Sequence, residues 1–309
     1  LKISIIGYKN HALRLKGIIQ KLGYKSISMF NHNEGDINDL SASDIYIIAS
    51  PNETHSEWIE IIRSFGKDKY IFCEKPPVTD LQQLTKIKDF DPKTYFNFNY
   101  RYSLLAKTLK KYLETDEIGK LIHASFISSH GLAFRKTYKD NWRFTGNTLS
   151  SSIIGNVGIH YIDLVNYLFG DIRDINITTR KIASENLPDS AFISIESQIC
   201  TSSIFISYAA PFRNEATVIF DDGIIELSNG QITIQSPRDT FDNKKRFKPA
   251  EIKIIETSFT DSTSYYDDSL INSISYLFDR VENNKSFSSS SYEKAIITNQ
   301  IVLDKIVDL

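Results

Sequence analysis

The expected helix at residues 153–169 carries the polar side chains whose spacing is most suited to chemistry. The helix is almost entirely apolar except for Asn156, His160, Asp163 and Asn166. These four follow one another at i, i+4, i+7 and i+10, so they share one helix face. An apolar helix is buried over most of its surface, and this polar stripe must therefore face water, a cleft or a partner.

Two glycines, Gly155 and Gly158, flank the first residue of the stripe. Each costs roughly 1 kcal/mol relative to alanine inside a helix, so the pair indicates that something approaches the backbone closely. A histidine with an ordinary pKa of about 6.5 can transfer protons near neutral pH. The alternative for His160 is an ordinary surface stripe in which water bonds the imidazole.

Length and composition indicate a two-domain protein without a basic surface. The chain has 309 residues, 36 Lys or Arg against 38 Asp or Glu, and a net charge of −2. This predicts no nucleic-acid partner and no anionic membrane partner. No apolar run approaches the ~18 residues of a membrane span, and the first strand is too short for a signal-peptide core. Cys73 and Cys200 lack metal-type spacing, so we expect reduced thiols and a cytoplasmic protein.

The first hundred residues alternate between short β-branched runs and helical patterns. Strands are expected at 2–7, 26–30, 44–50, 70–75 and 94–100, and helices at 11–22 and about 54–65. Strands separated by helices of this length form a parallel sheet covered on both faces. The pattern predicts a doubly wound Rossmann domain at residues 1–101, with its ligand outside the carboxyl ends of the strands.

The loop after the first strand should hold a dinucleotide pyrophosphate. It reads Gly7-Tyr8-Lys9-Asn10-His11-Ala12, so the first glycine and the permitted final alanine of G-x-G-x-x-G/A are present, whereas the middle glycine is Lys9. The missing glycine normally lets the backbone approach the pyrophosphate, so the Lys9 side chain must turn outward, where it can add a phosphate contact.

The segment after the second strand does not choose between NAD and NADP. An acid usually binds the ribose hydroxyls there, but the residues are Asn31, His32, Asn33 and Glu34. Asn31 is neutral, and Glu34 stands further along the chain than the usual acid. His32 could accept a 2′-phosphate, so the sequence is compatible with either NAD or NADP.

Four further segments resemble the glucose-fructose oxidoreductase and inositol dehydrogenase family (Gfo/Idh/MocA). The segments are Ser50-Pro51-Asn52-Glu53-Thr54-His55, Glu74-Lys75-Pro76, Asn99-Tyr100-Arg101 and Gly158-Ile159-His160-Tyr161-Ile162-Asp163. They are similar to the family's T-P-N-x-x-H loop, E-K-P signature, N-Y-R segment and G-x-H-x-x-D helix. The likeness covers residues 1 to about 170 in order and spacing, and the remainder only in outline.

The resemblance implies roles for individual residues. Lys75 and His160 would be catalytic with support from Asn156, because in the family the histidine exchanges the proton of the substrate hydroxyl as hydride passes to or from the nicotinamide. A cis peptide bond would precede Pro76, and His55 would be structural or ribose-proximal. NAD or NADP would contact Gly7, Tyr8, Lys9, Asn10, His11, Asn31, Ser50, Pro51, Asn52, His55, Glu74 and Lys75. Substrate would contact Lys75, Tyr100, Arg101, Asn156 and His160.

Physical chemistry supports Lys75 independently of the resemblance. A desolvated ammonium at the end of a buried strand can have a depressed pKa and can hydrogen-bond a reacting hydroxyl or carbonyl. The alternative is a strand-end lysine that reaches solvent.

The chain departs from the family pattern in three segments. Asn156 stands where the family usually has an aspartate, and it cannot carry the charge that would raise the basicity of His160. Lys9 and the run Ser150-Ser151-Ser152 replace glycines. These departures indicate a divergent substrate or a weakened enzyme, so the alternative function is a non-catalytic relative that senses a dinucleotide or sugar.

Residues 102–309 should form an α+β domain with a largely antiparallel open sheet, which binds substrate and forms oligomers. Strands are expected at 121–129, 175–181, 191–199, 202–210, 216–222, 223–228 and 231–235, and helices near 103–114, 265–283 and 291–308. Asp222-Gly223 and Asn229-Gly230 are hairpin signals. We expect Phe192, Ile204, Ile206 or their neighbours on the outer face, where they would pair with a second subunit of a homodimer or homotetramer or be covered by the chain's own helices.

The substrate should be a sugar, polyol or nucleotide-linked sugar. Trp142 and Arg143 offer an aromatic platform and a guanidinium, although an ordinary loop anchor is the alternative. The remaining histidines lack ligand spacing, so no metal is expected. The sequence thus predicts an NAD(P)-dependent oxidoreductase acting on CH–OH groups.

Overall fold

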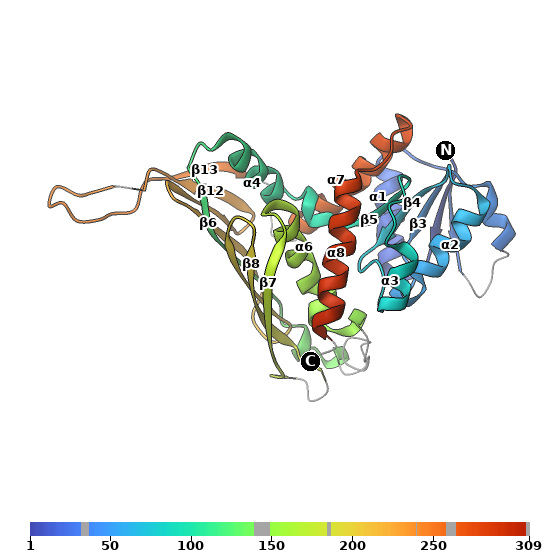
Figure 1. The fold of residues 1–309 in the computed structure, drawn as a ribbon, viewed down its shortest axis with the longest axis horizontal. Helices are drawn as coiled ribbons and strands as arrows, with labels where there is room; N and C mark the ends of the chain where they lie inside the picture. Colours follow the sequence, from blue (N-terminus) through green and yellow to red (C-terminus); the bar gives the residue numbers. More distant parts are fainter. Residues whose placement is uncertain (32–36, 139–148, 184–186, 239, 258–263, 307–309) are drawn as a thin grey trace. The chain divides into compact units, whose positions relative to one another are not determined.

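The computed structural model describes residues 1–31, 37–138, 149–183, 187–238, 240–257 and 264–306. The chain forms two compact units (Figure 1), Leu1–Asn99 with Ile271–Asp308, and Tyr100–Leu270. Trp142, Arg143, His32, Asn33 and Glu34 lie outside the described residues. None of the helices in the described ranges has the length and apolar character that a membrane span requires.

The first unit is built on a parallel sheet, as predicted. Its strands are β1 (Ile3–Ile6), β2 (Ile27–Phe30), β3 (Ile45–Ile48), β4 (Tyr70–Glu74) and β5 (Thr94–Asn97). Their order among the described residues is β2-β1-β3-β4-β5, and every neighbouring pair is parallel. β1, β3, β4 and β5 are buried throughout, as expected for strands covered on both faces. The doubly wound Rossmann architecture is confirmed.

Five α-helices of the described residues belong to this unit in whole or in part. They are α1 (Asn10–Lys21), α2 (His55–Phe65), the shorter α3 (Leu81–Ile87), α7 (Ser264–Glu282), which begins in the second unit, and α8 (Ser289–Ile306). α8 packs beside α3 and β5, where Asn299 Oδ1 accepts a hydrogen bond of 2.8 Å from the Val78 N–H. The sequence-based division placed 271–308 with the second domain. These residues instead group with the first unit, because their apolar faces are buried by long-range packing that local patterns do not reveal.

The second unit is built on a larger sheet. Its elements are α4 (Leu104–Thr115), β6 (Leu121–Ser129), α6 (Ile159–Leu168), β7 (Ile172–Arg180), β8 (Ser190–Ser197), β9 (Thr201–Ser207), β10 (Arg213–Phe220), β11 (Gly223–Ser228), β12 (Gln231–Gln235) and β13 (Ile252–Thr257). In the described ranges the order is β13-β12-β11-β10-β6-β9-β8-β7. The largely antiparallel sheet is confirmed, and both predicted hairpin turns join paired neighbours, β10 to β11 and β11 to β12.

Two features of this sheet were not predicted. β6 and β9 pair in parallel, because a chain that passes through α6 and two further strands returns to β6 instead of closing a hairpin. β13 was missed because a long connection separates it from β12.

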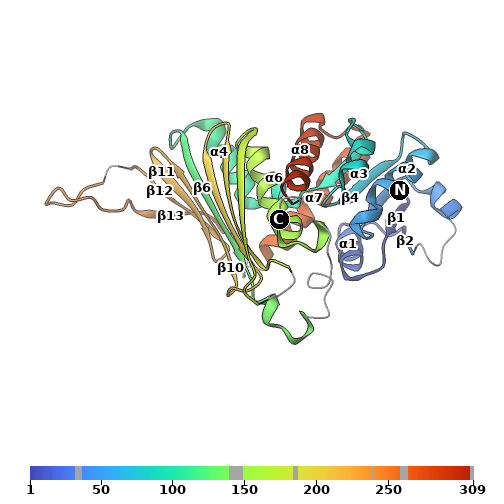
Figure 2. The same ribbon diagram turned by 60° about the horizontal axis from the view of Figure 1, so that its bottom comes forward.

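One face of the larger sheet is covered and the other is open. α4 and α6 lie on the same face (Figures 1 and 2), and the described part of this unit places no helix on the opposite face. Ile204 and Ile206, which were candidates for the open face, are fully buried and point to the covered face. Phe192 and Phe205 point to the open face and are 48% and 38% exposed.

The expected helix at 153–169 begins with a π-helical turn, Ile154–Gly158, before α6. The predicted close approach at the two glycines is confirmed. A Cβ on Gly155 would lie 2.1 Å from the Leu149 carbonyl oxygen, and one on Gly158 would lie 3.1 Å from Ile206 Cδ1. The wider π turn rotates Asn156 relative to the polar residues that follow it.

Candidate functional site

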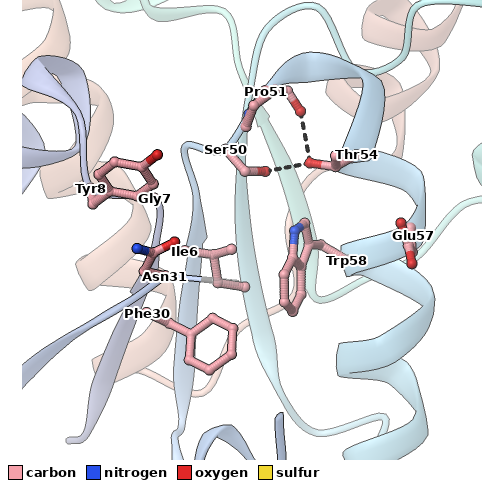
Figure 3. Close-up of a pocket in the computed structure, with 10 residues that line it drawn as sticks. All are labelled: Ile6, Gly7, Tyr8, Phe30, Asn31, Ser50, Pro51, Thr54, Glu57 and Trp58. Atoms are coloured by element: carbon pink, nitrogen blue, oxygen red, sulfur yellow. Dashed lines mark hydrogen bonds between the residues drawn. The ribbon is translucent and has the colours of Figure 1, made fainter. Parts of the chain in front are cut away.

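A pocket opens at the carboxyl ends of the first strands of the parallel sheet (Figure 3). Its lining is Ile6, Gly7, Tyr8, Phe30, Asn31, Ser50, Pro51, Thr54, Glu57 and Trp58. Five of the predicted cofactor residues, Gly7, Tyr8, Asn31, Ser50 and Pro51, therefore line one cavity. Ligands of doubly wound sheets bind at this edge.

The aromatic wall of this pocket was not predicted from the sequence. Phe30 and Trp58 meet edge to face, with ring centroids 5.6 Å apart, and Trp58 points into the cavity in Figure 3. Trp58 is only 4% exposed, so most of its surface packs against the protein. Its helical spacing in α2 predicted a core residue, and nothing local distinguished it from one. A flat apolar wall of this kind suits a heteroaromatic ring such as adenine.

The glycine loop is compatible with a dinucleotide in spite of Lys9. Gly7 has φ +133°, a conformation that favours glycine, and a Cβ there would lie 2.6 Å from the Ala49 carbonyl oxygen. Lys9 is exposed at the N-cap of α1 with φ −84°, which any residue adopts. The outward turn predicted for this side chain is confirmed. The N-terminus of α1 carries no acidic residue in its first turn, so its positive dipole end and Lys9 both suit a pyrophosphate.

We expect Gly7→Ala to destabilise the protein and weaken dinucleotide binding, whereas Gly17→Ala should stabilise it. The first change forces a positive φ on alanine against a backbone oxygen, at a cost of about 1–3 kcal/mol. The second lies inside α1 with nothing within 4 Å of the new Cβ, and a gain of about 0.4–1 kcal/mol is typical. Urea unfolding of both variants measures the two changes, and equal signs would contradict this account of Gly7.

His55 ties the loop after β3 to the Lys75-Pro76 turn. Its Nδ1 lies 3.0 Å from the Pro76 carbonyl oxygen and its Nε2 lies 3.3 Å from the Ser50 carbonyl oxygen. Burial lowers the pKa of this fully buried imidazole below its ordinary value of 6.5. A neutral ring donates only one N–H, and we assign it to the shorter contact with Pro76. These contacts make His55 a structural link between the two predicted motifs.

A buried polar chain holds Glu74, the residue before Lys75. Asn97 Nδ2 donates to Glu74 Oε1 at 2.8 Å, Ser273 Oγ donates to Asn97 Oδ1 at 2.7 Å, and the Tyr95 hydroxyl lies 2.8 Å from Ser273 Oγ. His11 Nε2 lies 2.9 Å from Glu74 Oε1. Burial alone would raise the pKa of Glu74, but His11, Asn97 and Lys75 together hold it below its ordinary 4.5. The carboxylate is therefore ionised near neutral pH and couples the start of α1 to the Lys75 turn.

Lys75 follows directly after β4 and is half-buried. The peptide bond between Lys75 and Pro76 is cis, as the resemblance implied. Lys75 and His160 belong to different units, and the meeting of their side chains at one substrate remains a prediction.

In the second unit His160 is buried against an aromatic ring. It is 5% exposed, and its imidazole stacks on Tyr100 with ring centroids 4.6 Å apart. Tyr100 also meets Tyr161 edge to face at 5.3 Å. The predicted companions His160 and Tyr100 are thus in contact.

Arg101 and Asp163 form a bidentate pair in the interior of the second unit. Arg101 Nε donates to Asp163 Oδ2 at 2.7 Å and Nη2 donates to Oδ1 at 2.5 Å. The two side chains are 2% and 1% exposed. Asp163, one residue of the polar stripe, therefore has a charged partner inside this unit. A contact between Arg101 and substrate remains a prediction.

Asn156 Nδ2 donates a hydrogen bond of 2.6 Å to the hydroxyl of Tyr208. The Tyr208 ring in turn stacks on His130 with centroids 5.0 Å apart. The sequence alone did not associate Asn156 with these residues, because Tyr208 lies 52 positions after it in the chain and His130 lies well before it, so only the fold brings them together.

Comparison with known proteins gives one consistent family. Residues 8–94 match a family model described as "Oxidoreductase family, NAD-binding Rossmann fold", and residues 106–226 match the GFO/IDH/MocA C-terminal domain. Glucose-6-phosphate 3-dehydrogenase of Bacillus subtilis is 33% identical over 135 residues, which are 42% of this chain and 38% of that protein. Levoglucosan dehydrogenase of Pseudarthrobacter phenanthrenivorans is 30% identical over 149 residues, which are 43% of this chain and 35% of that protein. The aligned segments thus span little more than a third of either relative.

Solved structures show the same fold over the whole chain. An oxidoreductase of Desulfitobacterium hafniense, described as putative and NADPH-dependent, has a TM-score of 0.79 and 16% identity, covering 100% of this chain and 95% of the other. Levoglucosan dehydrogenase in complex with NADH and levoglucosan has a TM-score of 0.76 and 16% identity, covering 100% and 96%. Both domain models of one family match in order along a chain that has this fold and this glycine loop. The chain therefore belongs to the GFO/IDH/MocA oxidoreductase family.

Proposed function

We propose that the chain is an NAD(P)-dependent oxidoreductase that moves a hydride between the nicotinamide and a hydroxyl-bearing carbon of a sugar or polyol. The observation that carries the proposal is the pocket beside Gly7, where five predicted cofactor residues gather. The two named relatives are both sugar dehydrogenases, which supports a substrate with CH–OH groups. A nucleotide-linked sugar is the finer alternative, suggested by Trp142 and Arg143 in the sequence.

The proposed chemistry assigns a task to each polar residue. When bound, NAD(P) supplies the hydride acceptor or donor. Lys75 hydrogen-bonds the reacting oxygen with its ammonium, and His160 takes the hydroxyl proton during oxidation and returns it during reduction. Tyr100 holds the His160 ring by stacking. Asn156 fixes the start of its helix through Tyr208.

The test is a titration of purified protein with NAD, NADH, NADP and NADPH, followed by nicotinamide fluorescence and thermal shift. A ligand present at a hundred times its Kd stabilises the native state by about 2.7 kcal/mol. Micromolar binding of one cofactor, with turnover of a sugar in a substrate screen, is the expected result. Failure of all four at millimolar concentration would contradict the proposal.

A sensor that binds a dinucleotide or sugar without turnover is the second candidate. It is favoured by one observation, the asparagine at position 156, whose amide donates to Tyr208 and carries no charge. Tight cofactor binding with no turnover across sugars, polyols and nucleotide-linked sugars would support it.

We further propose that the protein is a cytoplasmic homodimer or homotetramer that associates through the open face of the larger sheet. Exposed Phe192 and Phe205 on that face support the association. The two cysteines are separate buried thiols, which supports a reducing compartment. Sedimentation equilibrium tests the association, and a monomer at micromolar concentration would contradict it.

A further inference from the structure

His11 belongs to the glycine loop, but its side chain has no task in the proposed chemistry. It is the second residue of α1 and follows closely on Lys9, which stands where the family has its middle glycine. The resemblance placed His11 among the residues that contact NAD(P). His11 is nevertheless not among the ten residues that line the pocket beside Gly7 (Figure 3).

The imidazole of His11 is turned toward the interior of the first unit. Its Nε2 lies 2.9 Å from Glu74 Oε1, at the end of β4. That nitrogen is buried, and Glu74 is the only polar group that it meets in the described part of the chain. The side chain as a whole is 36% exposed. His11 therefore connects the surface at the start of α1 with a buried carboxylate.

Glu74 is held from two sides by residues of different elements. It is 7% exposed, and its Oε1 accepts a hydrogen bond of 2.8 Å from Asn97 Nδ2 of β5 while it faces His11 of α1. A buried carboxylate needs partners that replace its lost water. Burial by itself raises the pKa of Glu74, and His11 opposes this effect more strongly than Asn97 or Lys75 does. The ionised form of Glu74 thus depends most on His11.

Lys75 stands between two anchored neighbours. On one side is Glu74, and on the other is Pro76, whose carbonyl oxygen lies 3.0 Å from His55 Nδ1. The other nitrogen of His55 lies 3.3 Å from the carbonyl oxygen of Ser50, which lines the pocket. One histidine thus ties this segment to the first turn of α1, and the other ties it to the loop after β3. Both ties lead from a loop expected to bind the cofactor to the backbone of Lys75.

We propose that His11 is a positioning residue that holds Lys75 in place through Glu74, and that its side chain does not contact the dinucleotide. The proposal rests on the oxidoreductase function proposed above, since only then does Lys75 meet a reacting oxygen. A displacement of about 1 Å at a reacting group can lower the rate about a hundredfold. A positioning residue therefore affects kcat, whereas a cofactor contact affects the Kd of the dinucleotide.

Substitutions at His11 separate these two roles. His11→Leu fills the space of the ring without a donor, so it should lower kcat about tenfold and change the Kd of the preferred cofactor less than about threefold. His11→Gln, whose amide N–H can take the place of Nε2, should keep most of the rate. Gln20→Ala, an exposed change in the same helix, is the control and should behave as wild type. Unchanged kcat in His11→Leu, with or without a raised dinucleotide Kd, would overturn the proposal.

A double variant tests whether His11 acts through Lys75. Two residues that act as one unit have non-additive effects on the rate. His11→Leu combined with Lys75→Met should therefore be no slower than Lys75→Met alone, because no ammonium is left to be positioned. A further loss of about tenfold in the double variant would place the action of His11 on another group or on the fold in general. That result would overturn the proposal.

Chemical labelling gives a readout that needs neither cofactor nor substrate. Limited acetylation followed by peptide mass spectrometry gives the rate at which the half-buried Lys75 is modified relative to the exposed Lys67. Because loss of the His11 contact lets the turn open more often, His11→Leu should raise this ratio at least about threefold. Gln20→Ala should leave it unchanged.

The labelling result keeps the positioning role separate from the proposed function. A labelling ratio in His11→Leu equal to that of the wild type would overturn the proposal even where turnover falls. A raised ratio in a protein that binds no dinucleotide and turns over no sugar would support the hold of His11 on Lys75 and contradict only the oxidoreductase function.

Discussion

Lys75→Met should slow turnover at least ~100-fold and lower NAD(P) affinity far less, because general acid–base and polar contacts to a reacting oxygen are typically of this size and the other residues expected to contact the cofactor remain. Methionine has a similar length but no charge and no donor, so it removes the hydrogen bond to the substrate oxygen while filling the space beside Pro76. The measurement is kcat with the best substrate of the screen, together with the cofactor Kd by fluorescence titration.

Two variants control this experiment. Lys67→Met removes an exposed lysine of the same unit and should keep full activity. Asn97→Ala removes the donor to Glu74 and should lower kcat less than Lys75→Met, because it acts only by loosening the turn that positions Lys75. Wild-type turnover of Lys75→Met would remove this residue from the chemistry.

Asp163→Ala should destabilise the protein by about 3–5 kcal/mol, the usual cost of breaking a buried ion pair. The change leaves the Arg101 guanidinium buried, at 2% exposure, without its carboxylate. Unfolding in urea, followed by tyrosine and tryptophan fluorescence and by far-UV circular dichroism, measures the loss.

The matched control is an exposed pair. Glu60→Ala removes the partner of Lys86, where both side chains are about half exposed, and should change stability by less than about 1 kcal/mol. The double change Arg101→Met with Asp163→Leu should recover much of the loss, because no unpaired charge then stays buried. An Asp163→Ala protein as stable as Glu60→Ala would contradict the structural role of the pair.

The order of elements was largely readable from local patterns. Gly23 and Gly66 end helices at positive φ, as their places in the sequence indicated, and the Asn229-Gly230 turn joins β11 to β12. Period-2 and period-3.6 patterns report which face of an element is buried, and turn residues report where it ends. These patterns did not predict the π turn at Ile154–Gly158, because one extra residue in a helical turn changes the hydrogen bonding without changing the composition.

By itself, the sequence determined the alternation that makes the Rossmann unit, the glycine loop, and the motifs around Lys75 and His160. These are contiguous segments whose residue types and spacing carry the physical constraint directly. Only the tertiary structure decided that Trp58 lines the pocket beside Gly7, that Arg101 pairs with Asp163 and that the last helices join the first unit. Each of these depends on residues far apart in the chain that come into contact when apolar surface is buried and buried charges are paired. No local pattern encodes which of the possible contacts forms.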